Sequence, residues 1–378
     1  METLIVGCGL TGAVIARNLA ERGEQVTIWE RRSHIGGKMY DYIDENGIRV
    51  HKYGPHVFHT YNEKLKQYML RFAKWVDFPI KCQVDMLGKQ TPSPFNYKTI
   101  DDFYSREQAA ALKAALERSY PGRDKATIVE LLQSKDELVR SYADFLFEHD
   151  YSLYTAKQWG VSPKDIDLSV LKRVPVLFSY KDGYFDDPWQ MVPEMGYTGW
   201  FKCLLEHPNI SIQLNIDALE HLKVEDSTLL IDGERFSGKV VYTGAADELL
   251  QTRYGPLPYR SLRFEWRTEP VEHFQSAALV AYPEAEGFTR ITEYSHFPQM
   301  RRYEKTSLAY EYPLPYQEGG QAEPYYPLLT KESQERHKRY MKEPGRVPNL
   351  ILCGRLAQFK YYNMDQALEA ALIKCKSL

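Results

Sequence analysis

Residues 4–30 read LIVGCGLTGAVIARNLAERGEQVTIWE, in which an apolar strand meets Gly7-x-Gly9-x-x-Gly12, then a helix and a second strand that ends at Glu30. This order predicts the opening βαβ unit of a dinucleotide-binding fold. Gly7 permits a tight turn, Gly9 lets the backbone approach a pyrophosphate, and Gly12 allows close packing of helix on strand. The helix N-terminus supplies unpaired N–H groups, and Glu30 falls where a carboxylate can accept hydrogen bonds from an adenosine ribose. The motif leaves open which dinucleotide it holds.

Bulk properties restrict the class of protein. A chain of 378 residues exceeds one hydrophobic core, so we expect two or three domains. The net charge of −3 and the lack of a long basic block argue against a nucleic-acid partner. No apolar run approaches the ~18 residues that span a bilayer, and Met1 leads directly into a core strand. We therefore expect a cytoplasmic protein without membrane insertion. The five cysteines lack CxxC spacing, so we expect neither a disulfide framework nor a metal site.

Tyrosine is unusually frequent, with 28 residues and clusters at 310–316, 325–326 and 361–362. Its ring can stack and its hydroxyl can donate, which suits a nucleotide or sugar pocket.

Local patterns beyond residue 30 indicate further elements. Asn46-Gly47 favours a hairpin turn, and residues 101–149 have helical spacing. Strand patterns occur at 211–214, 228–231 and 239–242, and we expect the last two to return to the first domain. Four more strands, expected in a separate antiparallel sheet, cover residues 261–266, 277–282, 289–293 and 307–312.

The C-terminal residues predict a second anion site. A strand at 350–353 is followed by Gly354-Arg355, a loop, and a helix from about Asp365. A glycine turn near a helix N-terminus suits a phosphate, so both ends of the chain are expected to hold one long cofactor.

The expected fold class is therefore α/β, with a discontinuous Rossmann-like domain, an inserted helical domain and an antiparallel sheet domain. We assign residues 1–60, 190–250 and 345–378 to the Rossmann-like domain. The helical, substrate-binding domain covers 97–172, with a mobile loop at 160–176 bounded by Gly160 and containing Pro163 and Pro175. The sheet domain takes 61–96, 173–189 and 251–344.

The spacing Glu30-x5-Gly36-Gly37 resembles the extended ADP-binding motif of FAD proteins of the glutathione-reductase and amine-oxidase kind, and the C-terminal strand-glycine-helix resembles their second flavin motif. The resemblance favours FAD over NAD. The residues that it assigns to the cofactor are Gly7, Gly9, Leu10, Thr11, Gly12, Glu30, Arg31, Gly36, Gly37, Lys38, Tyr53, Gly54, His56, Arg355, Tyr362, Asn363 and Met364.

Longer segments extend the resemblance along the whole chain. They are HKYGPHVFHT at 51–60, YTAKQWG at 154–160, KRVPV at 172–176 with GYF at 183–185, FTR at 288–290, EYPL at 311–314 and GRLAQFKYYNM at 354–364. Collinear and in order, they resemble the bacterial UDP-galactopyranose mutases. The resemblance implies a flavin-dependent isomerase that interconverts pyranose and furanose forms of a nucleotide sugar, with no net redox change. In that family the reduced flavin N5 is the nucleophile at the anomeric carbon.

The resemblance also implies roles for individual side chains. Arg173 and Arg290 would clamp the diphosphate, because guanidinium groups match phosphate oxygens in pairs. Tyr184, Tyr312 and Tyr361 would donate hydrogen bonds to the phosphates, whereas Tyr325, Tyr326 and Tyr362 are expected to pack or lie on the surface. Residues expected along the substrate are Tyr154, stacked on uracil, Thr155, Trp159 and Asn363.

Two histidines in GPHVFHT are expected beside the flavin. His56 would act by hydrogen bonding near N5 rather than as the main acid or base, and His59 would lie close to the sugar. His34 and His51 are expected to be structural. We count His56, Arg173, Arg290, Tyr312 and Tyr361 as candidate catalytic residues.

Departures from the family pattern leave the substrate open. Asn363 stands where many members have Asp, Lys38 where Asn is usual, and Gln358 where Glu is frequent; residues 75–91 match poorly. UDP-galactose is the family default, while UDP-N-acetylgalactosamine or a dTDP-6-deoxysugar would use the same machinery.

Two other functions stay open. An FAD oxidase of the amine-oxidase type would not need the Arg and Tyr cluster, and a non-catalytic nucleotide-sugar binding protein would lack flavin. For the mutase, we expect an external reductant such as NAD(P)H or a flavin reductase, a homodimer, and a galactofuranose product used in cell-wall or polysaccharide biosynthesis.

Overall fold

A five-stranded parallel sheet is built around the N-terminal strand of the computed structural model, which describes residues 2–159, 174–225, 227–299, 303–316 and 322–378. Ile5 of the central strand lies opposite Ile28 on one side and Val241 on the other. Both faces of the sheet are covered, which explains why its strands are almost continuously apolar. In spatial order the strands are β12 (Ile210–Leu214), β2 (Gln25–Glu30), β1 (Glu2–Val6), β16 (Lys239–Tyr242) and β22 (Leu350–Leu352).

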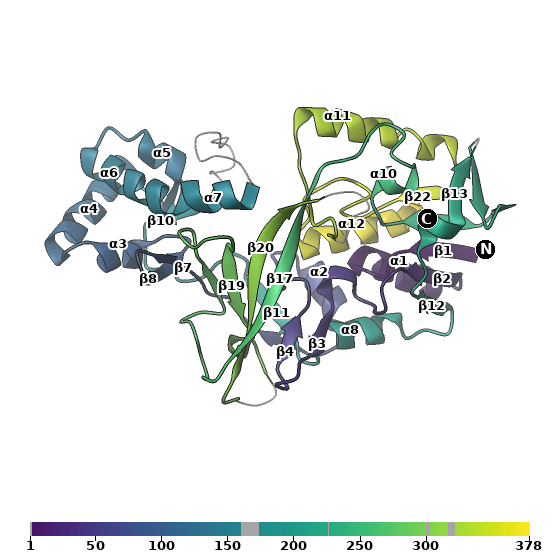
Figure 1. Cartoon of the computed structure of the whole chain (residues 1–378), viewed down its shortest axis with the longest axis horizontal. Coiled ribbons are helices and arrows are strands. Elements are labelled where there is room, and N and C mark those ends of the chain that lie inside the picture. The colour runs from purple at the N-terminus through teal and green to yellow at the C-terminus, as the bar shows by residue number, and fades with distance from the viewer. Residues whose placement is uncertain (1, 160–173, 226, 300–302, 317–321) are drawn as a thin grey trace.

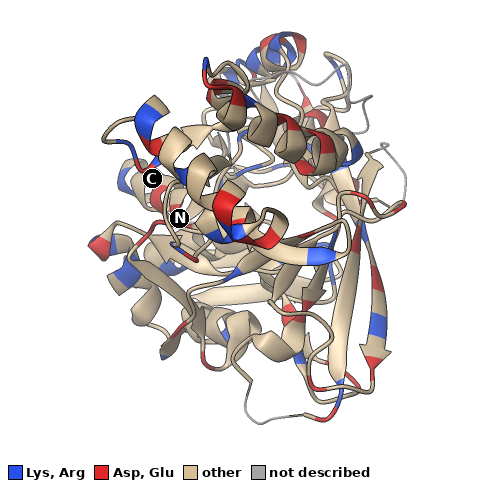
Figure 2. Ribbon diagram, turned by 90° about the vertical axis from the view of Figure 1, so that its left-hand side faces the viewer, with Lys and Arg blue, Asp and Glu red and all other residues tan. Residues whose placement is uncertain are grey.

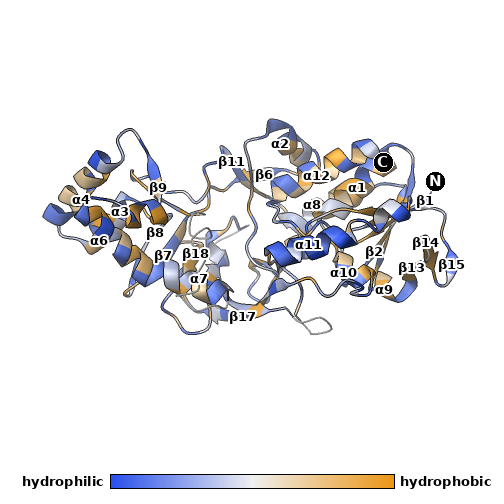
Figure 3. Cartoon of the chain, turned by 90° about the horizontal axis from the view of Figure 1, so that it is seen from above, coloured by the Kyte–Doolittle hydropathy of each residue, from blue (hydrophilic) through white to orange (hydrophobic). Residues whose placement is uncertain are grey.

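Helices cover the first face of this sheet. The helix after the glycine motif, α1 (Leu10–Glu21), packs against the C-terminal helix α12 (Met364–Ser377), and Arg22 donates to the Cys375 carbonyl at 2.6 Å. α8 (Gly196–Leu205) and α2 (Glu63–Leu70) complete this layer. Their buried faces are apolar, and Figure 3 shows the orange segments of α1 and α12 next to each other.

The opposite face of the sheet is covered by residues within 218–249, which the sequence analysis also places in the Rossmann-like domain, and by one helix that it places in the sheet domain. They belong to α9 (Ala218–His221), α10 (Ala246–Leu249), α11 (Lys331–Tyr340) and a meander of β13 (Leu222–Glu225), β14 (Thr228–Ile231) and β15 (Glu234–Arg235). Of the largely hydrophilic helix α11 (Figure 3), Ser333 and Tyr340 are buried.

Three expectations need correction. Residues 228–231 were expected, together with 239–242, to return to the first domain, but they form the middle strand of the meander. Residues 210–214, which were not given that role, form the edge strand of the parallel sheet. Both stretches are short and apolar, so their pattern does not choose between sheets. The helices α2 and α11, expected in the sheet domain, pack on the parallel sheet because their apolar faces complete its two cores.

A seven-stranded sheet occupies the middle of the molecule (Figure 1). The four strands expected from 261–312 all form, and the sheet is antiparallel except where β18 runs parallel to β7. In spatial order the strands are β21 (Tyr326–Pro327), β17 (Tyr259–Glu269), β20 (Thr306–Pro315), β19 (Arg290–Glu293), β18 (Leu279–Ala281), β7 (Cys82–Met86) and β8 (Lys89–Ser93).

The predicted helical insertion forms the end of the molecule farthest from the parallel sheet (Figure 1). Side-chain caps explain where its helices begin: the Asn96, Ser105, Thr127 and Asp136 side chains each accept from a backbone N–H of the first turn. The helices are α3 (Tyr97–Phe103), α4 (Arg106–Ser119), α5 (Ile128–Leu132), α6 (Glu137–Leu146) and α7 (Ser152–Trp159), with a π-helical stretch at Phe147–Tyr151.

Most of the predicted loop 160–176 lies outside the described residues. Its last residues were expected to belong to the mobile loop. Instead they form a strand, β10 (Pro175–Leu177), which pairs with β9 (Lys125–Thr127). Proline is tolerated there because it begins a strand at the edge of a two-stranded sheet.

Smaller elements join the two main sheets. The hairpin predicted at Asn46-Gly47 connects β3 (Asp41–Ile43) to β4 (Arg49–His51), and β5 (Phe58–Thr60), β11 (Trp189–Pro193) and β6 (Trp75–Asp77) form a three-stranded sheet. Acidic and basic residues are interspersed along the ribbon (Figure 2). Within the described parts of the chain, no helix is both long and apolar enough to cross a bilayer.

Candidate cofactor and substrate site

Two of the three glycines of the first motif, Gly7 and Gly12, sit where a side chain would collide with neighbouring atoms, whereas Gly9 faces the pocket. Gly7 has φ +99°, and a Cβ there would lie 2.2 Å from Thr243 Oγ1; a Cβ at Gly12 would lie 2.0 Å from the Gly7 carbonyl oxygen. Gly37 crosses above Gly9, where an added Cβ would lie 2.8 Å from the Gly9 Cα. The two glycine segments therefore form one turn with exposed backbone at the N-terminus of α1.

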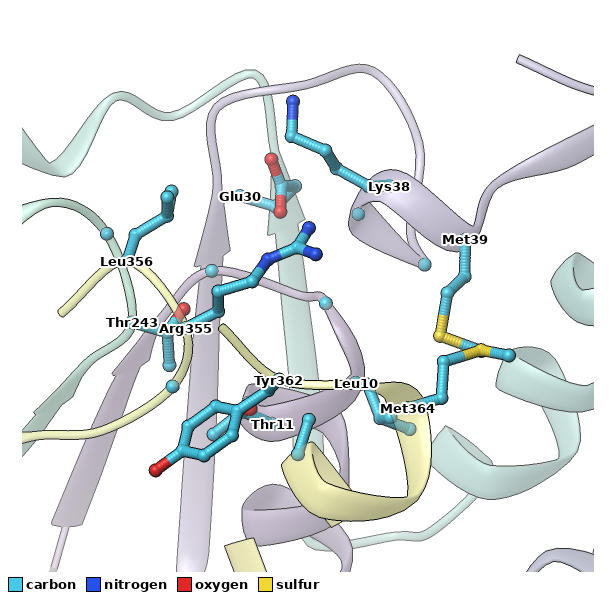
Figure 4. A pocket seen from close by; sticks show the side chains of 18 of the residues that line it. Leu10, Thr11, Glu30, Lys38, Met39, Thr243, Arg355, Leu356, Tyr362 and Met364 are labelled. Atoms are coloured by element: carbon cyan, nitrogen blue, oxygen red, sulfur yellow. The ribbon is translucent and has the colours of Figure 1, made fainter. Parts of the chain in front are cut away.

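A cavity of about 430 Å³ opens over this turn (Figure 4), within the usual range of ligand pockets. It lies beyond the carboxyl ends of β1, β2 and β16, as the rule for open parallel sheets requires. Figure 4 shows Glu30, Lys38 and Arg355 projecting into it and the sulfur atoms of Met39 and Met364 facing each other.

Glu30 is almost fully buried, and the chain itself positions its carboxylate. Oε2 accepts from the Cys8 N–H at 2.8 Å, and Oε1 accepts from the Arg32 backbone N–H and Nη1 at 3.0 Å each. These bonds hold the acid at the end of β2 with its orientation set before a ligand arrives. Carboxylate oxygens have about four lone-pair sites, so acceptor capacity remains for a ribose.

A charged network lies on the other side of the pocket. Glu323 receives Arg32 Nη2 at 2.7 Å and Lys38 Nζ at 2.6 Å, while Lys38 also lies 3.5 Å from the Tyr325 ring centre. Burial opposes ionisation of Glu323, but Lys38 and Arg32 together lower the pKa of that carboxyl to about 2. Lys38, which departs from the family pattern, is thus one arm of an ion-pair network that Glu323 completes.

The C-terminal motif approaches the first motif directly. Gly354, at φ +100°, would place a Cβ 3.3 Å from Thr11 Oγ1, so the turn lies against the start of α1. Gln358 Oε1 accepts from the Gly354 N–H at 3.2 Å and from the Tyr362 hydroxyl at 3.4 Å, which folds the loop back on itself. Asn363 is the N-cap of α12, a position that Asn and Asp fill about equally well.

The two predicted histidines both line the pocket. His56 Nδ1 donates to the Gly54 carbonyl at 2.8 Å, and burial, with His51, Arg355 and Arg290 nearby, lowers the pKa of His56 to about 3. The imidazole is therefore neutral at pH 7, and its Nδ1 is the protonated nitrogen. A carbonyl oxygen can only accept, so Nδ1 carries the hydrogen of the neutral ring and Nε2 is left as an acceptor.

His59 has one partner at its ring face and another at its Nδ1 atom. Its ring stacks on Phe185 with centroids 3.7 Å apart, and its Nδ1 lies 2.9 Å from Asp187 Oδ2. Phe185 also lines the pocket, which the sequence analysis did not predict.

Arg290 and Tyr154 come together from different domains. Arg290, on β19, lies directly opposite Glu311 on β20, and its Nε and Nη2 contact Glu311 Oε2 at 2.8 and 2.7 Å. Burial raises the pKa of Tyr154 on α7, with Arg290 opposing and Glu311 and Tyr184 adding to the rise. Tyr154, Tyr184, Arg290 and Glu311 are therefore close enough to influence one another's ionisation, and they lie beside the pocket.

Tyr326 and Tyr361 form the link between this cluster and the pocket. Their rings stack at 5.5 Å with 10° between planes, both line the pocket, and Arg355 lies 5.6 Å above the Tyr326 ring. Tyr326 is also among the groups that raise the pKa of Arg290. The sequence analysis expected Tyr326 to pack or to lie on the surface, so its place in the pocket is a correction.

Tyr312 is not brought to this site. It lies opposite Arg263 on the sheet, with that guanidinium 4.0 Å from its ring centre, and packs against Phe288. Since neighbouring strand residues point to opposite faces, Tyr312 faces away from the side that holds Glu311 and Arg290. We do not retain its expected phosphate contact.

The other predicted residues divide into three groups. Most of the assigned cofactor residues line the pocket, but Tyr53 and Gly54 do not; the Tyr53 hydroxyl lies 2.8 Å from His34 Nε2, and the left-handed Gly54 shapes the turn before His56. Thr155 is buried on α7. Arg173 and the side chain of Trp159 lie outside the part of the chain that the structure describes.

Further pocket residues were not predicted: Trp29, Arg32, Met39, Pro55, Val57, Asp217, Thr243, Gly244 and Leu356. Thr243 and Gly244 could have been predicted to line the pocket, because they directly follow the strand at 239–242. Ligands of open parallel sheets bind at that end of a strand.

One His/Glu cluster lies outside the pocket, made of His273, Glu293 and His296. Glu293 accepts from the backbone N–H groups of Phe274 and Gln275, and the two imidazoles stack at 4.2 Å. His296 Nε2 donates to the Gln275 carbonyl at 2.9 Å, and His273 Nδ1 lies 3.1 Å from Ser295 Oγ, so these ring nitrogens already have protein partners and we interpret the cluster as structural.

The parallel sheet, the glycine turns and the pocket define a Rossmann-type dinucleotide-binding protein, and residues 5–72 match the NAD(P)-binding Rossmann-like family. Residues 150–361 match the UDP-galactopyranose mutase family.

Full-length relatives agree with that match. The chain is 33% identical to the probable UDP-galactopyranose mutase of Klebsiella pneumoniae, covering 98% of this chain and 92% of the relative. It is 32% identical to the dTDP-fucopyranose mutase of Escherichia coli, covering 100% and 98%. A crystal structure of reduced UDP-galactopyranose mutase superposes with a TM-score of 0.71 at 18% identity, over 99% of this chain and 93% of the other.

The chain therefore belongs to the UDP-galactopyranose mutase family and is an isomerase of that type.

Proposed function

We propose that this isomerase binds FAD and uses it to interconvert the pyranose and furanose forms of a nucleotide-linked sugar, with UDP-galactose as the default substrate. Two features support FAD. The glycine cradle presents bare backbone where a pyrophosphate would lie, and the N-termini of α1 and α12 both open onto the pocket. Glu30 at the end of β2 suits the adenosine ribose.

One observation carries the proposal. The pocket continues from the glycine turn past His56 and His59 to the Tyr326–Tyr361 stack, beside which Arg290 and Tyr154 lie. Buried Arg and Tyr groups suit an anion with a sugar and a base attached, whereas the cationic amine that an amine oxidase takes would be repelled by Arg290.

When bound and reduced, the flavin would supply the nucleophile at the anomeric carbon. The chain's own groups hold the parts that leave and return. Arg290 keeps donors for a phosphate, because the contacts with Glu311 use Nε and Nη2 of a group with five N–H donors. Tyr326 and Tyr361 add hydroxyls at the same point, and Arg173 would complete the clamp.

His56 is placed to accept rather than to supply a proton. Its neutral ring, fixed through Nδ1, would offer Nε2 as an acceptor to a hydrogen-bond donor of the cofactor or sugar. A proton-transfer role at pH 7 would need a pKa nearer to that pH.

Comparison with named relatives leaves the nucleotide and the sugar substituents open. Relatives named for UDP-galactopyranose and for dTDP-fucopyranose are almost equally similar to this chain, so identity does not choose between them.

The test is a substrate screen. The purified protein, reduced with dithionite, is incubated with UDP-galactofuranose, dTDP-fucofuranose and the furanose form of UDP-N-acetylgalactosamine, and the products are separated by chromatography. Conversion to the pyranose by the reduced but not the oxidised protein supports the proposal. Failure with every sugar, or oxygen consumption coupled to an amine, would refute it in favour of an oxidase. NAD(P)H alone in place of dithionite tests whether a separate flavin reductase is needed.

A further inference from the structure

The ammonium group of Lys157 is one of the groups that join the helical insertion to the central sheet; His149, whose Nδ1 lies 3.0 Å from Glu284 Oε1, is another. Lys157, in the last turn of α7, donates from Nζ to the carbonyl oxygens of Tyr282 and Ala285 at 2.6 Å each and of Phe288 at 2.9 Å. A lysine has three N–H donors, so these three bonds use all of them. Lys157 is therefore saturated by backbone carbonyls and has no donor left for a substrate.

The three carbonyls belong to the connection between β18 and β19. Ala281 pairs with Arg290 across that hairpin, and the Tyr282 N–H donates to the Thr289 carbonyl at 2.8 Å. The segment that Lys157 holds thus ends two residues before Arg290. Its conformation decides where β19 begins and where the Arg290 guanidinium lies.

The same helix carries Tyr154, one turn before Lys157, on the side where Arg290 and Glu311 shape its electrostatic environment. Figure 1 shows α7 as the helix of the insertion that reaches β20. The base-stacking candidate and the diphosphate clamp lie on different domains, and Lys157 ties the two together.

We propose that Lys157 is a positioning residue that sets the spacing between the nucleoside subsite on α7 and the diphosphate subsite at Arg290. This rests on the proposed function, since it requires a nucleoside diphosphate as the bound group. Two subsites on one ligand reinforce each other only when their geometry allows simultaneous engagement. If α7 were displaced, each subsite could still bind its own part of the ligand. The base and the diphosphate of one molecule could no longer bind both subsites at once, so the whole ligand would bind more weakly.

The test compares a whole ligand with its halves. The Lys157→Met holoenzyme keeps the apolar stem and removes the three donors. Calorimetry with UDP, uridine and inorganic pyrophosphate should show UDP binding weakened at least tenfold, with uridine and pyrophosphate each within twofold of wild type. Lys113→Met is the matched control, because the Lys113 ammonium bonds Tyr180 and Asp101, neither of which belongs to the β18–β19 connection. It should leave all three affinities unchanged.

Each outcome decides the assignment. UDP affinity within twofold of wild type, or a parallel loss for UDP and uridine, overturns it, since the second result means local damage to α7. If Lys157→Met fails to fold, Lys157→Gln, which retains two donors, must show a smaller loss confined to UDP. If wild type binds neither UDP nor dTDP, while Lys157→Met keeps its flavin and thermal stability, the proposed function itself fails and this assignment with it.

Discussion

The glycine turn must both pack against its own backbone and leave space for a cofactor. Alanine substitutions at Gly12 and Gly9 should separate these two requirements. A Cβ at Gly12 would lie 2.0 Å from the Gly7 carbonyl oxygen, and this contact is with backbone that no rotamer change can relieve. A Cβ at Gly9 would meet nothing nearer than the Gly37 Cα at 3.9 Å, an ordinary contact. The protein alone therefore tolerates a methyl group at Gly9 and not at Gly12.

The magnitudes follow from these contacts. Overpacking costs roughly 1–3 kcal/mol, and we expect Gly12→Ala at the upper end, about 3 kcal/mol of apoprotein stability. Gly9 has φ −80° and ψ −173°, which any residue adopts, so Gly9→Ala should leave the apoprotein unchanged or raise its stability by about 0.4–1 kcal/mol. Gly9 lines the pocket, however, and a methyl group there would occupy pyrophosphate space. We expect its Kd for FAD to rise at least tenfold, or about 1.4 kcal/mol.

Urea unfolding of the apoproteins, followed by circular dichroism, measures the first effect, and quenching of FAD fluorescence measures the second. Gly345→Ala serves as the control, because a Cβ there meets nothing within 4 Å. The reasoning is refuted if Gly12→Ala is as stable as Gly345→Ala, or if Gly9→Ala retains wild-type affinity for FAD.

Three further predictions concern the other half of the site. Tyr326→Phe should lower kcat/KM at least tenfold, whereas Tyr312→Phe should stay within twofold, because only the former lines the pocket; equal effects would contradict the assignment. Arg290→Lys should abolish most turnover while FAD stays bound, and loss of the yellow colour on purification would show that Arg290 supports the cofactor instead. Glu323→Gln should destabilise the protein at pH 7, since the folded-state pKa of Glu323 lies below its unfolded value of about 4.3. That stabilisation is present above about pH 4.3 and disappears as the pH falls through about 2, so the urea-unfolding curves of variant and wild type should converge across that window and not above it.

The part of the site that would hold the cofactor could largely be predicted from the sequence, because the residue patterns that define it are local. Gly7, Gly12 and Gly354 sit at left-handed or sterically closed positions that only glycine fills, so the constraint is visible in the residue type itself. The strand that precedes each turn is equally local, and its apolar run shows that it is buried on both faces.

The substrate half depended on contacts between distant segments. Tyr312 and Tyr326 are both tyrosines on strands near the end of the sheet, and sequence alone does not say which strand face points to the pocket. A shift of one residue in strand register exchanges the two faces, and the register of β20 is set by its pairing with β17 and β19. Glu323 was missed for the same reason, since its partners Lys38 and Arg32 lie almost 300 residues earlier.

The sequence by itself determined the Rossmann-like fold, the glycine cradle, the helical insertion and the family, because these follow from short patterns of backbone conformation and burial. Only the tertiary structure decided that residues 210–214 form the sheet edge, that Tyr326 replaces Tyr312 beside Arg290, and that Lys157 joins α7 to the hairpin before β19. The physical reason is that backbone conformation is encoded within a few residues. The meeting of two side chains depends instead on the register and packing of every element between them.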